Sequence, residues 1–490
     1  MTDAREPAVA DVSADAPEPV AQTARRALWW SIANNVVGRV GTTLIGIVLA
    51  RILVPEDYGI YAVALVALNG LLSVNELGVS LAIVRWPGDV SRIAPTVVTL
   101  SLVSSAVLWV AMFFAAPLVA DALNAPDATL LVRFLTLSVL IDAATAVPAA
   151  LMTRDFMQRE RMIVDSAGFV IASLTAIVLA ILGYGAWALV WSALLGNVVN
   201  AAFIMRYAPR RYAPGFRRDV ARELLSFGMP LALASLIIIA LLNVDYVVIG
   251  AELGPVALGF YLLAFNLSTW PVNMFSAPAR RVSLPLFARL NAGDASASTA
   301  FVPVCSVLIL FTLPACLALA VFAEPLIRTV YGQTWMAAAS VLPWLMVLAL
   351  ARVLSELAYD FLVALGTSRA NLALQVVWLI ALLVALPIAV KSGGIEGVAI
   401  AHAGIALLVA GPSYAFVLHR TGVSLRAIAA QIARPLAGAA LAAGAGIGVL
   451  QLVDGRLVQL ALGCALVGLV YLAVVYPMRA LLRAPAVSAA

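Results

Sequence analysis

Charged residues are scarce in this sequence: they make up 11% of its 490 residues, against about a quarter in soluble domains. Hydrophobic residues make up 64%, which is more than a soluble core of this size can bury. No segment alternates apolar and polar residues as the strands of a transmembrane barrel do. The sequence therefore predicts an all-α polytopic membrane protein.

Cysteine and histidine are also rare, with three and two residues. The cysteines lie inside apolar runs and form no C-x-x-C pair, which indicates small core residues rather than a disulfide. A metal site needs clustered histidine, cysteine or carboxylate side chains, and the sequence contains no such cluster. No G-x-x-x-x-G-K-[ST] phosphate loop occurs either. We therefore expect no metal, no cofactor and no direct use of ATP.

Positive charge comes almost entirely from arginine, because Lys391 is the only lysine. A formal net charge of +5 would suit a nucleic-acid-binding protein. In a membrane protein, however, basic residues gather in the cytoplasmic loops for topological reasons. We therefore expect contacts with membrane lipids and no nucleic-acid partner.

Fourteen segments are long and apolar enough to span a membrane. They are 28–50, 58–84, 93–120, 128–152, 162–182, 185–205, 224–250, 256–279, 299–323, 336–365, 370–390, 395–418, 432–453 and 457–478. Arginines cluster after the even-numbered segments, above all at 206–223, and are few after the odd-numbered ones. This alternation predicts a multi-pass protein of the cell (inner or plasma) membrane with both termini in the cytoplasm.

The motif L-x-P-x-x-x-G-x-Y occurs twice, at 53–61 and at 253–261. Two further matches follow in the same order, Pro117 with Pro325 and Gly183 with Gly394. An even number of helices per unit returns the chain to its starting side, so the two units have the same orientation. Such parallel repeats, related by an axis along the membrane normal, place a transport site between them.

The repeat divides the chain into five predicted parts. They are a disordered cytoplasmic tail at 1–27, an N-lobe at 28–205, a cytoplasmic linker at 206–223, a C-lobe at 224–420, and two C-terminal helices with a short tail at 421–490.

Four segments resemble motifs of one family. LARILVPEDYGIY at 49–61 resembles the first hairpin of polysaccharide and oligosaccharide exporters, the Wzx-like flippases of the multidrug/oligosaccharidyl-lipid/polysaccharide (MOP) superfamily. N-x-D-x-x-x-I-G at 243–250, GYGAWAL at 183–189 and YGQTW at 331–335 resemble further motifs of the same family. The resemblance covers about residues 25–420, while 421–490 match by position alone.

This resemblance implies a fold and a function. The fold is a two-lobed helical bundle around a central cavity. The substrate is a lipid-linked oligosaccharide, carried on a polyprenyl pyrophosphate and flipped outward by alternating access for exopolysaccharide or lipopolysaccharide biosynthesis. A transporter rather than an enzyme is implied, with polysaccharide polymerase or export machinery as candidate partners.

Such a substrate needs cationic and hydroxyl-binding groups in a hydrated cavity. Charged residues within spans usually face the protein interior, because exposure to lipid is costly. The candidate substrate-binding residues are Asn35, Arg39, Glu76, Asn243, Asn273, Arg352 and Glu356. Two structural alternatives stay open: Arg39 could pair with Glu76, and the stripe of Arg352, Glu356 and Asp360 could pair internally.

An acid on the seventh helix can belong to a cation site in this superfamily, so the resemblance assigns ion coupling to Asp245. Asn371 and Gln375, four residues apart on 370–390, are candidates to complete that site. Sodium and protons both stay open as the coupling ion, because Gln375 supplies no carboxylate. We interpret His402 as a packing residue.

Two other functions stay open. A cation-coupled multidrug antiporter could use the same scaffold, although buried arginines would repel cationic drugs. A membrane glycosyltransferase or polymerase usually needs a substantial soluble domain or loop, which the short external loops disfavour.

Overall fold

The computed structural model describes residues 38, 41–75, 83, 86, 88–292 and 297–479. These residues are helical almost throughout, and the described ranges contain no strand. The predicted all-α fold is therefore confirmed. The predicted tail and three predicted site residues, Asn35, Arg39 and Glu76, lie outside the described residues and stay predictions.

The first described helix is Gly41–Ile52. The elements after it are α2 (Pro55–Asn75), η1 (Val90–Arg92), α4 (Ala94–Ala122), α5 (Ala128–Leu135), α6 (Ser138–Arg154), α7 (Gln158–Ile181), α8 (Ala186–Tyr207), α9 (Arg218–Pro271), η2 (Val272–Ser276), α10 (Ala277–Ala292), α11 (Ala297–Val321), α12 (Ala323–Val330), η3 (Gln333–Trp335), α13 (Ala337–Ala364), α14 (Ser368–Ile405), η4 (Ala406–Ala410), α15 (Gly411–Arg420), α16 (Leu425–Leu452), α17 (Arg456–Val475) and η5 (Tyr476–Met478).

Ten helical runs of the described residues are long and apolar enough to cross a membrane. Two of them, Ser235–Asn291 and Arg369–Arg420, have 57 and 52 residues, which is enough for two spans each. Each contains one glycine with a positive φ, Gly254 at 77° and Gly394 at 57°, where the chain turns back. With Gly41–Ile52 and α2, the described helices account for the fourteen predicted spans.

Two predicted boundaries differ from the structure. The segment predicted to end at 279 continues as helix to Ala292, because the arginines of α10 are paired or exposed rather than in a loop. The predicted linker at 206–223 is partly helical as well. Its non-helical part is 208–217, since α8 ends at Tyr207 and α9 begins at Arg218.

The start of α2 shows why the first hairpin carries a proline followed by two acids. Pro55 is the first helical residue, where its missing N–H costs nothing, and Asp57 lies in the first turn, where the helix dipole favours an anion. One oxygen of Asp57 accepts from the backbone N–H of Val54 at 3.2 Å. The other accepts from the N–H of Ala186 at 3.0 Å. Asp57 therefore fastens this turn to the first residue of α8.

The two copies of the repeated motif pack against each other. A Cβ atom on Gly59 would lie under 3.0 Å from the carbonyl oxygen of Pro255. A Cβ atom on Gly259 would lie under 3.0 Å from the carbonyl oxygen of Pro55. The contact is reciprocal, as expected for equivalent hairpins that face each other across a pseudo-twofold axis. The motif is repeated because each glycine makes room for the backbone of the other copy.

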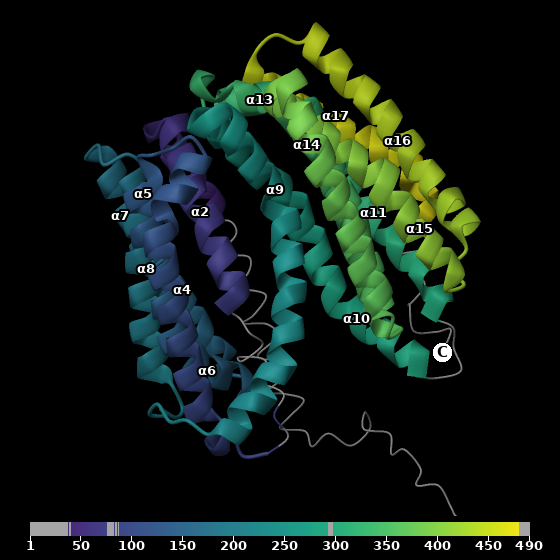
Figure 1. The fold of residues 1–490 in the computed structure, drawn as a ribbon. Coiled ribbons are helices and arrows are strands. Elements are labelled where there is room, and N and C mark those ends of the chain that lie inside the picture. The colour runs from purple at the N-terminus through teal and green to yellow at the C-terminus, as the bar shows by residue number, and fades with distance from the viewer. Residues whose placement is uncertain are drawn as a thin grey trace, which may run out of the picture.

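The helices form two groups with α9 between them. Figure 1 shows α2 and α4–α8 on one side and α10–α17 on the other. The groups lie close together where α2, α9 and α13 meet, and their ribbons diverge toward the opposite end. The main hydrophobic core contains buried residues of both groups. A smaller core at the opposite end lies under the start of α4 and α9.

The last two long helices, α16 and α17, pack on the outer side of α11 (Figure 1). Tyr471 on α17 donates to the carbonyl oxygen of Leu310 on α11 at 3.1 Å. Gly446 and Gly463 have no side chain because Phe322 packs directly against them. These helices therefore extend the second group rather than form a separate domain.

Candidate polar sites between the helices

The predicted stripe on α13 contacts the run from α9 to α10. Asp360 has a buried side chain and accepts two hydrogen bonds from Arg280 on α10, at 2.9 Å from Nε and 2.8 Å from Nη2. This bidentate geometry is the strongest form of an arginine–carboxylate pair. The Arg280 side chain is still 42% exposed, so it can contact a second partner.

The two other members of the stripe also have partners outside α13. Glu356 accepts a hydrogen bond from Ser276, the last residue of the π-helical segment η2. Asn273, another predicted residue, is half-buried on the same segment. The guanidinium carbon of Arg352 lies 5.6 Å from the centre of the Phe265 ring, a cation–π contact. The alternative of internal pairing is wrong for Asp360, because its partner is Arg280.

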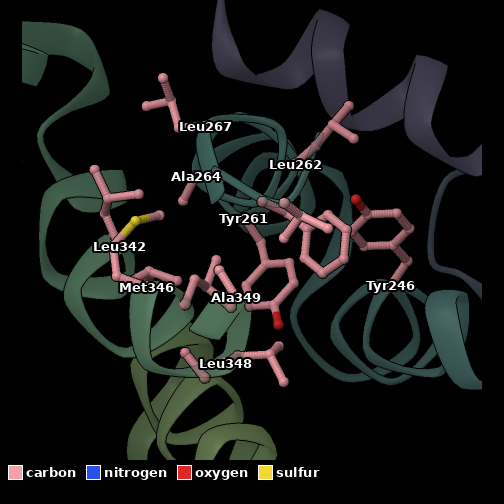
Figure 2. Close-up of a cluster of buried hydrophobic side chains, with 14 of the residues drawn as sticks. Tyr246, Tyr261, Leu262, Ala264, Leu267, Leu342, Met346, Leu348 and Ala349 are labelled. Atoms are coloured by element: carbon pink, nitrogen blue, oxygen red, sulfur yellow. The ribbon is translucent and has the colours of Figure 1, made fainter. Parts of the chain in front are cut away.

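A second polar group lies among apolar side chains between α9, α13 and α14. Asp245 is fully buried, and Tyr261 donates a hydrogen bond to its Oδ2 at 2.7 Å. His402, which is 4% exposed, places Nδ1 at 3.5 Å from the same oxygen. Asp245 Oδ1 and His402 Nδ1 have no hydrogen-bond partner. Figure 2 shows the Tyr261 ring reaching from α9 toward Leu348 and Ala349.

The two glycine turns bring these three residues to one depth. Asp245 lies nine residues before Gly254 and Tyr261 seven residues after it. His402 lies eight residues after Gly394. At 1.5 Å per residue, all three lie roughly 10 to 14 Å from their turns. This spacing is visible in the sequence. It places the three residues at the same depth only because both turns lie at the same end of the bundle.

The structure separates Asn371 and Gln375 from this group. Both side chains are buried, and Asn371 Oδ1 has no hydrogen-bond partner. Gln375 lies 19 residues before Gly394, so it is about 16 Å farther from that turn than His402 is. The recorded partners of Asp245 are Tyr261 and His402. A role of Asn371 and Gln375 in ion coupling stays a prediction.

Asn243 joins the two groups of helices. Its side-chain oxygen accepts from Nδ2 of Asn69 on α2 at 3.2 Å. Its own Nδ2 donates to the carbonyl oxygen of Ile239 at 2.8 Å. An asparagine pair between helices satisfies both side chains without leaving a charge in the bundle.

Two side chains fasten the joined end by binding backbone carbonyls. Arg51, at the end of the first described helix, donates to the carbonyl oxygens of Thr329 and Val330. The indole N–H of Trp335 donates to Ala50 O at 2.7 Å, and this bond is buried. We call Arg51, Trp335 and their partners the latch.

A matching bond comes from the other half. Asn124, in the turn after α4, donates to Ala251 O at 2.5 Å. Ala251 is the counterpart of Arg51 at the 200-residue offset of the repeat. Each half therefore holds the hairpin of the other through a side chain of its own outer turn.

A groove of about 970 Å³ lies at the same end, between α12 and the turn from α16 to α17. Its charged lining residues are Glu324, Arg328 and Arg456. None of the predicted site residues lines it. The central cavity implied by the sequence resemblance stays a prediction.

The arrangement of repeated hairpins and buried charges is found in a fold with solved examples. The structure is similar to the lipid II flippase MurJ in its inward closed conformation, with a TM-score of 0.74 and 14% identity, covering 93% of this chain and 100% of that one. It is also similar to an inward-facing multidrug resistance MATE family transporter of the MOP superfamily, with a TM-score of 0.63 and 18% identity, covering 79% of this chain and 95% of that one. The chain therefore shares the fold of these two solved structures.

The family follows from the sequence profile described as "Polysaccharide biosynthesis protein", which matches residues 48–340. This is more than half of the chain, and the chain belongs to that family.

Two curated relatives are similar over about two thirds of their length. The lipopolysaccharide biosynthesis protein WzxC of Escherichia coli (strain K12) is 29% identical over 345 residues, 68% of each chain. The succinoglycan biosynthesis transport protein ExoT of Rhizobium meliloti (strain 1021) is 28% identical over 329 residues, 65% of each chain.

Proposed function

We propose that this protein moves a lipid-linked oligosaccharide, carried on a polyprenyl pyrophosphate, from the cytoplasmic to the outer leaflet of the cell membrane. The match of residues 48–340 to the polysaccharide biosynthesis family carries the proposal. The relatives act in lipopolysaccharide biosynthesis and in succinoglycan transport, according to their names. The proposal contains no chemical step: the substrate crosses the membrane unchanged.

The orientation follows from the basic residues. The end of α6, the turn from α8 to α9 and the end of α15 lie at the diverging end of the bundle. These segments carry arginines, among them Arg154, Arg210, Arg211 and Arg420. Basic residues mark the cytoplasmic side, so the diverging end faces the cytoplasm and the latched end faces outward. Both termini then lie in the cytoplasm. In this proposal, the described conformation is a state closed on the outside.

Transport in this proposal is alternating access of two lobes, 28–205 and 224–420. The latch closes the outer end, and its bonds exchange for water when the lobes rock apart there. All its acceptors are neutral backbone carbonyls and Arg51 is exposed, so water can replace both partners when the latch opens. The non-helical part of the linker, 208–217, connects α8 to α9 at the cytoplasmic end and accommodates the motion.

The pyrophosphate is proposed to bind on the α9–α10 side of α13. Arg280 is half exposed while it holds Asp360, and an arginine fork suits phosphate oxygens. Arg352 on the Phe265 ring supplies a second cation. Asn273, Glu356 and Asn243 are proposed to bind glycan hydroxyls near these cations, and Asn35, Arg39 and Glu76 remain candidates from the first helices. The polyprenyl tail stays in the lipid.

The test is a deletion strain. Loss of the gene is expected to abolish the surface polysaccharide and to accumulate its lipid-linked precursor on the cytoplasmic side. Complementation with the wild-type gene restores export, and complementation with Arg280→Ala restores little at an equal protein level. Normal surface polysaccharide without accumulation would refute the proposal. Increased drug sensitivity in place of the polysaccharide defect would favour a multidrug antiporter.

The strain complemented with the wild-type gene tests the proposed partners. Polysaccharide polymerase or export machinery that depends on this protein should co-purify with it from crosslinked membranes. A deletion of such a partner should leave the precursor on the outer leaflet, because flipping precedes polymerisation.

A further inference from the structure

The group formed by Asp245, Tyr261 and His402 is built differently from the other polar contacts in the described part of the chain. Those bonds pair a donor with an acceptor. Here a carboxylate and an imidazole approach to 3.5 Å and each keeps an atom without a hydrogen bond. Tyr261 alone donates to the carboxylate. In an arginine–carboxylate salt bridge the proton stays on the guanidinium. A carboxylate and an imidazole in this geometry can instead share a single proton, which can lie on either group.

The surroundings of this group are apolar and aromatic. Figure 2 shows Tyr261 and Tyr246 packed among leucine, alanine and methionine side chains of α9 and α13. The Tyr246 and Tyr261 rings contact each other edge to face, at 6.0 Å between ring centres. Water has no hydrogen-bonding partners along such a wall, so a charge inside it is stabilised by few dipoles.

The titratable and charged groups that face the pair are few. On α9 they are Tyr246 and Tyr261, and on α13 the nearest is Arg352, whose guanidinium lies over Phe265. Farther along α13, Glu356 is bonded to Ser276. At the turn above the pair, Lys391 is paired with Glu252 at 3.7 Å. Arg352 is therefore the one described cation that can compensate the pair when it is negative.

We propose that His402 and Asp245 together hold one exchangeable proton, and that this proton is the coupling ion of the transport proposed above, on which the inference rests. With the proton, the pair is neutral overall, as imidazolium with carboxylate or as imidazole with carboxylic acid. Without it, a carboxylate is left with one hydrogen bond. A buried carboxylate with one hydrogen bond is strongly disfavoured, so the proton leaves only when water reaches the pair.

This requirement ties proton binding to conformation. Water reaches the pair from one side of the membrane at a time if the lobes open alternately. The proton is taken from outer water onto the imidazole or carboxylate when the latch is open, and it is returned to water on the cytoplasmic side. The substrate moves in the opposite direction in the same cycle. The chemistry is one O–H or N–H bond formed and the same bond broken.

A sodium ion suits the group less well. Hard cations bind oxygen ligands, several at a time, and this group offers one carboxylate, one phenol oxygen and an imidazole nitrogen. In the described residues, no three histidine, cysteine or acidic side chains gather in a way that could hold a metal ion.

The backbone after His402 supports a functional role. The helix continues through a π-helical turn at Ala406–Ala410, one turn beyond the histidine. Such turns occur mostly at functional sites, because the inserted residue can be absorbed by a small rotation of the helix. A rotation of this kind would change the distance between His402 and Asp245 without breaking α14.

The chain offers a direct test because it has two histidines only. His419, the other one, is exposed at the end of α15, so His419→Gln leaves a full-length protein with a single imidazole. Labelled with ¹⁵N-histidine in nanodiscs, this variant reports the protonation of His402 alone. We expect Asp245→Asn in the same background to change the protonation state that the ¹⁵N signals of His402 report, because the carboxylate lies 3.5 Å from Nδ1. An imidazole that stays in one form from pH 5 to 9, with and without Asp245→Asn, would overturn the proposal.

The second test measures coupling. The probe is a polyprenyl pyrophosphate carrying a nitrobenzoxadiazole-labelled disaccharide, in proteoliposomes whose membrane voltage is clamped at zero. One proton per cycle against a pH difference of one unit should move the ratio of probe between the leaflets by up to about tenfold. The orientation of the protein in the liposome membrane does not matter, because the coupling requires only that the proton and the probe move in opposite directions. His402→Gln and Asp245→Asn should still flip the probe, but the ratio of probe between the two leaflets should stay at one despite the pH difference. His419→Gln should behave as wild type.

The outcomes separate the two proposals. If wild-type protein does not flip the probe at all, the proposed function fails for this substrate. If it flips the probe but ignores the pH difference, or responds to a sodium gradient instead, the proposed function stands and the proton site is refuted. A pH response that persists in His402→Gln refutes the role of this pair, whatever the response of Asp245→Asn.

Discussion

The two copies of the hairpin share a backbone but not the polar groups attached to it. Leu53, Pro55, Gly59 and Tyr61 all recur 200 residues later. Asp57 does not recur, since Ala257 takes its place. In the first copy this acid binds the turn to α8, so its role is structural.

The buried pair shows the opposite asymmetry. The counterpart of Asp245 in the first half is Ile45, and the counterpart of His402 at the 211-residue offset is Trp191. Trp191 stacks on Trp187, a purely apolar contact. The tyrosine is present in both copies, as Tyr61 and Tyr261. Duplication therefore explains the architecture and the joined end, whereas the titratable pair belongs to one half alone.

The largest effect is expected where the two copies are the same. Gly59→Val and Gly259→Val each place a side chain onto a proline carbonyl of the other half. Relieving this overlap requires the hairpins to separate, which should cost at least about 3 kcal/mol and leave little folded protein. Size-exclusion chromatography in detergent measures the folded fraction.

The matched control for the glycine variants is Gly70→Ala. It lies on α2 as well, but a Cβ atom there would contact nothing within 4 Å. The control should keep its folded fraction. Unequal effects at Gly59 and Gly259 would contradict a symmetric junction.

The next largest effect is a loss of stability at Arg280 in the second half, which is compared with the loss at Arg133 in the first half. Arg280→Leu leaves the buried carboxylate of Asp360 unpaired, which should destabilise the protein by about 1 to 3 kcal/mol. This predicted destabilisation is smaller than that expected for a fully buried ion pair, because Arg280 is partly exposed. Arg133→Leu in the first half removes a donor to the carbonyl of Phe113 and leaves no charge behind, so its effect should be smaller.

Thermal unfolding in detergent ranks the two arginine variants. The double variant Arg280→Leu with Asp360→Leu should recover most of the loss, because it removes the unpaired charge together with its partner. If the double variant is as unstable as Arg280→Leu alone, the cost comes from lost packing rather than from the carboxylate.

Sequence reasoning reached the elements that depend on hydrophobic length and on turn residues. The fourteen spans, the doubled hairpin and the family follow from runs of about 20 apolar residues and from motifs such as L-x-P-x-x-x-G-x-Y. It missed what depends on tertiary geometry. Arg280 was assigned to a loop because two arginines interrupt an apolar run, and only Asp360 on a distant helix explains why the helix continues. His402 was interpreted as packing because one histidine in an apolar run has no visible partner until α9 is placed beside it.

A smaller effect is expected at the latch. Trp335→Phe keeps a ring beside Tyr58 but removes the N–H that satisfies Ala50 O, which should weaken the joined end by about 1 to 2 kcal/mol. Asn124→Ala removes the matching bond of the other half. Both should favour an open outer end, measured as a lower yield of crosslinking between Ala125→Cys and Glu252→Cys in a Cys464→Ser background. Ser340→Ala, an exposed change on α13, is the control, and equal yields in all variants would show that the latch does not hold the outer end closed.

The smallest effect is expected for Asp219→Asn, an exposed counterpart of the buried substitution Asp245→Asn. Asp219 lies at the start of α9, and the hydrogen bond from Arg217 at 2.9 Å lowers the pKa of its carboxyl. A lowered carboxyl pKa gives stability that is present above the unfolded value and lost as the pH falls through the folded one. Both side chains are more than half exposed, so solvent screens the pair, and Asp219→Asn should leave the melting temperature and the flipping ratio unchanged at neutral pH. Asp245→Asn makes the same chemical change at full burial and should abolish the response to a pH difference. If Asp219→Asn reduced that response to the same extent, the coupling would come from the overall charge of the protein and not from the buried pair.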